Sequence, residues 1–81
     1  MRVIFAEAAA QVFAELPEPV RRRAARSIDL LENHPRMYPV RKRGLMRGYR
    51  YFVAHQHLFY YDETSEEVRI TAIIPGVMRQ A

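Results

Sequence analysis

The sequence predicts an α+β domain in which a short N-terminal strand and a helical hairpin pack on one face of a three- to four-stranded, mostly antiparallel sheet. Residues 6–31 carry apolar side chains at helical spacing, with a break at Leu16-Pro17. Residues 49–74 instead hold three runs rich in β-branched and aromatic residues. The chain has 81 residues and no repeat or linker, so residues 1–81 are expected to form one domain in the order β-α-α-β-β-β.

A strand and a helix are predicted at the N-terminus. The run Arg2–Phe5 is apolar and partly β-branched, which suits a first strand. Residues 6–16 follow, and we expect them to form a helix with one buried stripe. That stripe consists of Val12, Phe13 and Leu16, together with Phe5 or Ala9.

A second helix is predicted to begin at Pro19, because a proline in the first turn of a helix sacrifices no hydrogen bond. Its expected buried face recurs at spacings of four, four and three residues, at Val20, Ala24, Ile28 and Leu31. The helix should end at Asn33-His34-Pro35, since the residue before a proline is pushed out of the helical region.

The second half of the chain is predicted to form strands after an irregular, basic segment at 36–46 that includes a short strand near Val40. The runs 49–54 and 57–62 are separated by a link short enough for a hairpin. Residues 68–74 alternate, so we expect Val68, Ile70, Ala72 and Ile74 on one face and Arg69, Thr71 and Ile73 on the other.

Parity along the hairpin makes a prediction about faces. Arg50, Phe52 and Ala54 share one face of their strand. With the hairpin in register, we expect the open face of the sheet to carry His57, Phe59 and Tyr61. Leu58 and Tyr60 would then point towards the helices.

Composition excludes several classes of protein. The chain has no cysteine, which rules out a disulfide framework, a thiolate zinc site and a cysteine nucleophile. The apolar run at Met1–Phe5 is followed at once by Glu7 and is too short for a signal peptide or a membrane span. We therefore expect a cytoplasmic protein with no membrane partner. The pair His55 and His57 lacks a nearby cysteine or aspartate, so no metal and no cofactor are predicted.

Positive charge is the main functional signal. The net charge is +4, and no acid occurs between Glu32 and Asp62. This interval includes the basic residues Arg41, Lys42, Arg43 and Arg47. Guanidinium groups suit phosphate and carboxylate partners, so the segment is either an RNA-binding phosphate track or a solvated loop beside an acidic protein partner. Both interpretations stay open, because one surface can serve both.

Three stretches together resemble the RelE/ParE superfamily of bacterial toxins. Residues 16–35, with Leu16-Pro17 followed by Val20-Arg21-Arg22-Arg23 and later Leu30-Leu31, resemble its second helix. Gly48-Tyr49-Arg50 resembles the Gly-x-Arg opening of a strand, and residues 57–61 with 68–76 resemble the C-terminal strand pair. Their order and spacing, over nearly the whole chain, carry the resemblance.

The resemblance implies the toxin of a type II toxin–antitoxin module, neutralised by a cognate antitoxin protein, as a homodimer or as a heterotetramer with that antitoxin. RelE-like members cut mRNA on the ribosome, whereas ParE-like members inhibit DNA gyrase without cutting anything. We expect first a ribosome-dependent, metal-independent mRNA endoribonuclease. The alternatives are a ParE-like gyrase inhibitor and a toxin fold that has lost its toxicity.

The resemblance also implies a set of catalytic residues on the open face of the sheet. Arg50 stands at the family's basic strand position, and His57 could act as acid or base because histidine is the side chain type whose unperturbed pKa lies nearest neutrality. Tyr61 is a candidate for base stacking, and Arg79 lies near the basic position expected after the last strand. RelE-like enzymes carry a catalytic tyrosine in the tail, and no tyrosine follows residue 74 here, which counts against cleavage.

Overall fold

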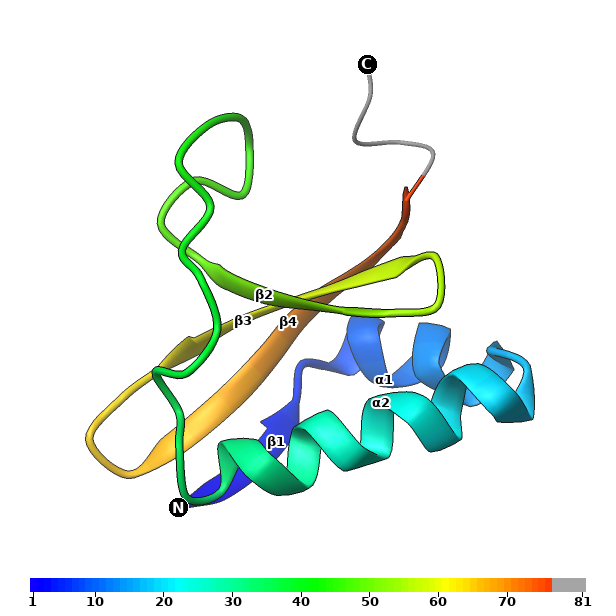
Figure 1. Ribbon diagram of the computed structural model, residues 1–81, viewed down its shortest axis with the longest axis horizontal. Helices are drawn as coiled ribbons and strands as arrows, with labels where there is room; N and C mark the ends of the chain where they lie inside the picture. The colour runs from blue at the N-terminus through cyan, green and yellow to red at the C-terminus, as the bar shows by residue number, and fades with distance from the viewer. Residues whose placement is uncertain (77–81) are drawn as a thin grey trace.

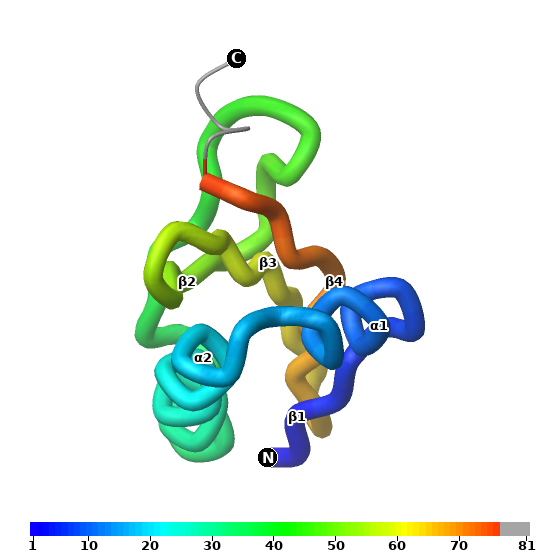
Figure 2. Tube along the Cα trace, turned by 90° about the vertical axis from the view of Figure 1, so that its right-hand side faces the viewer, coloured from blue at the N-terminus to red at the C-terminus, as the bar shows by residue number. Residues whose placement is uncertain are grey.

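The computed structural model describes residues 1–76, and its elements follow the predicted order (Figure 1). The four strands form one mixed sheet with the order β1-β4-β3-β2, and both helices lie on the same side of it (Figures 1 and 2). This confirms the predicted α+β class. The elements are β1 (Arg2–Phe5), α1 (Glu7–Glu15), α2 (Glu18–Leu31), β2 (Arg50–Ala54), β3 (His57–Glu63) and β4 (Glu67–Pro75).

Strand β1 is the parallel member of the sheet. It pairs with β4, with Val3 opposite Val68 and Phe5 opposite Ile70, whereas β2–β3 and β3–β4 are antiparallel. The ladder continues one residue further, because the amide of Ala6 donates to the carbonyl of Ile70 at 2.9 Å. Strand β1 therefore ties the start of α1 to the centre of the sheet.

Helix α1 buries a narrower stripe than the sequence predicts. Ala9 and Leu16 are buried and Phe13 is half-buried, but Val12 is 40% exposed. The prediction for Val12 is therefore wrong. A nine-residue helix against a sheet presents only one narrow face, and Phe13 occupies it by packing between Phe5 and Phe59, at ring-centroid distances of 5.0 and 6.3 Å.

Helix α2 begins as predicted, with Pro19 in its first turn. Val20, Ala24 and Leu31 are buried and Ile28 is half-buried. Ser27 is buried on the same side, where its hydroxyl accepts a hydrogen bond from the Tyr38 hydroxyl at 3.1 Å. That bond fastens α2 to the segment that leads into β2.

The prediction about the hairpin faces is wrong. Arg50 lies opposite Tyr61, Phe52 opposite Phe59 and Ala54 opposite His57, so these six share one face as expected. That face points towards the helices, because the Phe59 ring stacks on Phe52 at 4.8 Å and meets Phe13 of α1. Leu58 and Tyr60 point the other way and are buried outside the main core cluster.

A β-bulge alters the alternation in β4. Tyr60 pairs with Ala72, but Tyr61 pairs with Ile70, so Thr71 is an extra residue opposite that step. Val68 and Ile70 join the core before the bulge, and Ile73 joins it after the bulge. The predicted grouping of Ile74 with Val68 and Ile70, and of Ile73 with Arg69, is therefore wrong.

No helix among residues 1–76 is long and apolar enough to cross a membrane.

Candidate nucleic-acid interface

Residues 41–48 form a closed loop, which we call the basic loop. Its neck is held by two backbone hydrogen bonds, from the Arg41 amide to the Tyr49 carbonyl at 2.7 Å and from the Gly48 amide to the Arg41 carbonyl at 2.9 Å. The bridge between Val40 and Arg50 continues this pairing, so an isolated β-bridge stands where a short strand was predicted near Val40. In Figure 1 the basic loop projects beyond the sheet, away from the helices.

Glycines give the basic loop its tight path. Gly44 and Gly48 have φ values of 85° and 93°, in the region that only glycine enters at low cost. Between them, the Arg47 amide donates to the Gly44 carbonyl at 3.2 Å. The loop is therefore a turn stabilised by its own backbone hydrogen bonds, and most of its side chains are exposed.

The side chains of the basic loop are mostly free to meet a ligand. Lys42, Arg43 and Arg47 are exposed, while Arg41 is half-buried and its Nε donates to the Arg43 carbonyl at 3.1 Å. Leu45, at the tip, is fully exposed. None of the ion pairs found within residues 1–76 involves these four basic residues. The loop is thus a concentrated positive charge that no acid of the described chain neutralises.

Arg50 lies on the face of the sheet that packs against the helices, and its guanidinium bonds to other groups of the protein. Its Nη1 donates to the Tyr38 carbonyl at 2.8 Å, its Nε lies 3.4 Å from Glu63, and its side chain is 25% exposed. Arg36 approaches the other carboxylate oxygen of Glu63 at 3.3 Å. Glu63 therefore bridges two arginines, and the guanidinium of Arg50 is engaged by protein atoms.

Tyr61 is a core residue. Its side chain is fully buried, and its hydroxyl donates to the Pro35 carbonyl at 2.8 Å. Burial raises the pKa of Tyr61 to about 12, although the neighbouring Arg50 charge opposes this rise. The expectation that Tyr61 lies on an open face is therefore wrong, and the ring has no exposed surface on which a base could stack.

His57 lies at the other end of the hairpin from these groups. It is half-buried, and its Nδ1 is buried without a hydrogen-bond partner within residues 1–76. Along β3 it is four residues from Tyr61, roughly 13 Å at the usual rise of a strand. The structure brings Arg50 and Tyr61 together, but it does not bring His57 to them, so these three do not form one catalytic centre. Arg79 lies outside the described residues.

Sequence reasoning missed Glu63 and Tyr38, which hold Arg50. The available signal was an acid at the end of the hairpin strand that pairs with the strand carrying Arg50.

In the described part of the chain, no three His, Asp or Glu side chains gather where they could hold a metal ion. The chain matches no protein-family model and no curated protein.

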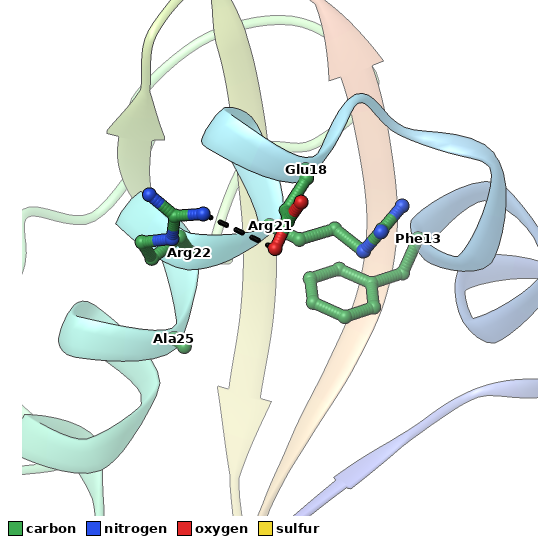
Figure 3. Close-up of a pocket in the computed structure, with 5 residues that line it drawn as sticks. All are labelled: Phe13, Glu18, Arg21, Arg22 and Ala25. Carbon is green, nitrogen blue, oxygen red and sulfur yellow. Dashed lines mark ion pairs between the residues drawn. The ribbon is translucent and has the colours of Figure 1, made fainter.

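A hollow of about 360 Å³ lies between the helices, lined by Phe13 of α1 and by Glu18, Arg21, Arg22 and Ala25 of α2 (Figure 3). Arg21 extends over the Phe13 ring towards α1 and donates to the Leu16 carbonyl and, at 3.4 Å, to the Ala14 carbonyl. These carbonyls lie at the end of α1, where a cation is favourable. Arg21 therefore serves the packing of α1 on α2.

Proposed function

We propose that this protein is the toxin component of a toxin–antitoxin module that arrests translation by acting on mRNA at the ribosome, and that it holds RNA phosphates with the basic loop. The observation that carries the proposal is the loop itself. Four basic residues lie at one end of the fold, three of them exposed, and none of the four has an acidic partner in residues 1–76.

Phosphate binding by the basic loop has a quantitative signature. Each phosphate that a cation neutralises releases counterions, with a slope of about −0.7 per contact for a single strand. Four contacts give a slope near −3, so affinity for single-stranded RNA should fall roughly 50-fold between about 50 and 200 mM salt. An aromatic base-stacking surface would give a weaker dependence on salt.

The chemistry of cleavage needs an acid, a base and cations around the phosphate. Of the residues implied by the resemblance, Arg50 and Tyr61 are bound to Glu63, Tyr38 and Pro35. Within residues 1–76, His57 is then the one member of the set with an unused nitrogen. A nuclease mechanism would have to combine His57 or Arg79 with the ribosome's own groups.

The engagement of Arg50 and Tyr61 by protein atoms favours a second candidate function. A ParE-like inhibitor of DNA gyrase needs a binding surface and no acid–base pair. In that case the basic loop would contact gyrase or its DNA, and no RNA would be cut.

The experiment that separates these functions is a map of mRNA 5′ ends in cells shortly after induction. The test variant is Arg43→Gln/Arg47→Gln in the basic loop. The matched control is Arg2→Gln/Arg69→Gln, which removes the same charge from exposed arginines outside the loop. We expect new ends phased to codons with the native protein and the control, and few or none with the loop variant.

Growth arrest without new ends would remove the nuclease function and lead directly to a gyrase supercoiling assay. No arrest in a strain lacking any antitoxin would contradict both functions. An acidic antitoxin should cover the basic loop and reverse the arrest, and it should raise the melting temperature because it binds the folded state alone. An unchanged melting temperature at saturating antitoxin would contradict that partner.

A further inference from the structure

A second basic cluster, which we call the arginine hollow, lies over the start of α2. It is an open hollow with a volume of about 230 Å³, which equals the volume of about seven or eight water molecules in liquid water. Its lining residues are Pro19, Arg22, Arg23, Arg26 and His55. None of these residues is acidic. It lies at the end of β2 remote from the basic loop (Figure 1), so it does not depend on the function proposed above.

Helix geometry gathers the three arginines. Arg26 is three residues from Arg23 and four from Arg22, so all three project over one side of a single turn. The fourth cation-capable group comes from elsewhere in the chain. His55 sits in the turn between β2 and β3, with a φ of 55° in the left-handed region. The fold therefore brings the imidazole of His55 to a surface of three arginines, although His55 lies 29 residues after Arg26 in the sequence.

The charge of this cluster is incompletely balanced. Arg22 pairs with Glu18 at 3.1 Å, on the exposed surface of the helix. Arg23 and Arg26 form no ion pair within the described residues. Guanidinium groups crowded on one turn repel one another, and a multiply charged anion between them would replace that repulsion with attraction.

We propose that the arginine hollow binds a phosphate dianion, either free or as the terminal group of a phosphomonoester. A terminal phosphate offers three acceptor oxygens and about two negative charges, which suits several planar guanidinium forks that line one hollow. A phosphodiester backbone offers one charge per group and is bound by cations spread along a track. Three arginines of α2 line a single hollow here, so we expect the site to take one dianion rather than a strand of diesters. The same chemistry is present in free phosphate and in a small phosphorylated molecule.

The test is a titration followed by two-dimensional NMR at about pH 7.5, where a phosphomonoester is mostly dianionic. The probes are inorganic phosphate, a nucleoside 5′-monophosphate, and a dinucleoside monophosphate that carries only an internal diester. The amide of His55 is the reporter, because it remains present in every variant. The variant Arg23→Gln/Arg26→Gln is compared with the charge-matched Arg2→Gln/Arg69→Gln, and circular dichroism verifies that both are folded.

We expect saturable shifts at His55 with the first two probes in the native protein and in Arg2→Gln/Arg69→Gln. Binding should weaken at least tenfold in Arg23→Gln/Arg26→Gln, and the diester should bind at least tenfold more weakly than either dianion. Tighter binding of the nucleotide than of inorganic phosphate would identify a phosphorylated small molecule as the source, and equal binding would identify free phosphate. Non-saturable shifts, equal weakening in both variants, or a diester that binds as tightly as the dianions would overturn the proposal.

Discussion

Replacing Tyr61 with phenylalanine separates its structural role from a catalytic one. The phenol is fully buried and donates to the Pro35 carbonyl at 2.8 Å, so Tyr61→Phe removes one hydrogen bond and leaves a carbonyl without its partner. At about pH 8 this should lower the free energy of unfolding by about 1 kcal/mol. The ring itself is retained, so no large cavity opens.

Alkaline pH should reverse the order of stability. The pKa of Tyr61 is raised by burial to about 12 in the folded protein, against an ordinary value of 10.0. Above pH 10 the unfolded chain releases this proton while the folded chain keeps it, so stability falls as pH rises. The loss is about 1 kcal/mol at pH 11 and about 2 kcal/mol at pH 12. Tyr61→Phe lacks this loss, so its curve should cross that of the native protein between about pH 10.5 and 11.

Urea unfolding followed by far-ultraviolet circular dichroism measures both effects. Every other tyrosine is common to the two proteins, so the difference between their free energies isolates Tyr61. Parallel pH curves, or equal urea midpoints at about pH 8, would refute the burial and hydrogen bonding of the phenol. If the native protein arrests growth as proposed, loss of that arrest in a Tyr61→Phe protein of unchanged stability would instead identify Tyr61 as a functional residue.

Three further substitutions test other contacts. Glu63→Gln removes the carboxylate partner of Arg50 and should cost about 1 to 2 kcal/mol in urea unfolding, and an unchanged midpoint would mean that the pair contributes nothing. His55 has a φ of 55°, and this left-handed conformation costs a non-glycine residue about 1–2 kcal/mol. His55→Gly removes that strain, but the extra freedom of glycine in the unfolded chain costs about 0.5–1 kcal/mol. A small rise in melting temperature is therefore expected, and a fall would show that His55 makes a contact worth more than the strain. Gly76→Ala places a Cβ 2.6 Å from the Gln56 carbonyl oxygen and should destabilise the protein by about 1–3 kcal/mol, whereas unchanged stability would mean that the end of β4 yields freely.

Local chemistry made the elements predictable. Pro17 and Pro19 separate two helices because proline blocks a continuous one, and the alanine and leucine spacing of α2 selects its buried face. The hairpin follows from two runs of β-formers with a two-residue link. Each of these signals acts within a few residues, so it is present in the sequence whatever the rest of the chain does.

Such local signals do not predict which face of the β2–β3 hairpin packs against the helices. In β3, residues of both parities are large and apolar, so alternation does not say which set meets the helices. Phe59 and Tyr61 were therefore assigned to the wrong side, and Arg50 was expected on an open surface. The bulge at Thr71 then shifted the alternation of β4 by one residue, through a register set by pairing with β3.

The sequence by itself determined the strand and helix order, the basic segment at 36–46 and the absence of cysteine chemistry, because these depend on residue type and short-range spacing. Only the tertiary structure decided which cations are free. It neutralises Arg50 with Glu63 and buries Tyr61 under Pro35, yet leaves the basic loop and Arg23 and Arg26 without acidic partners in residues 1–76. The physical reason is that the Arg50–Glu63 pair joins residues 13 apart on two paired strands, and this contact exists only after the hairpin has set its register.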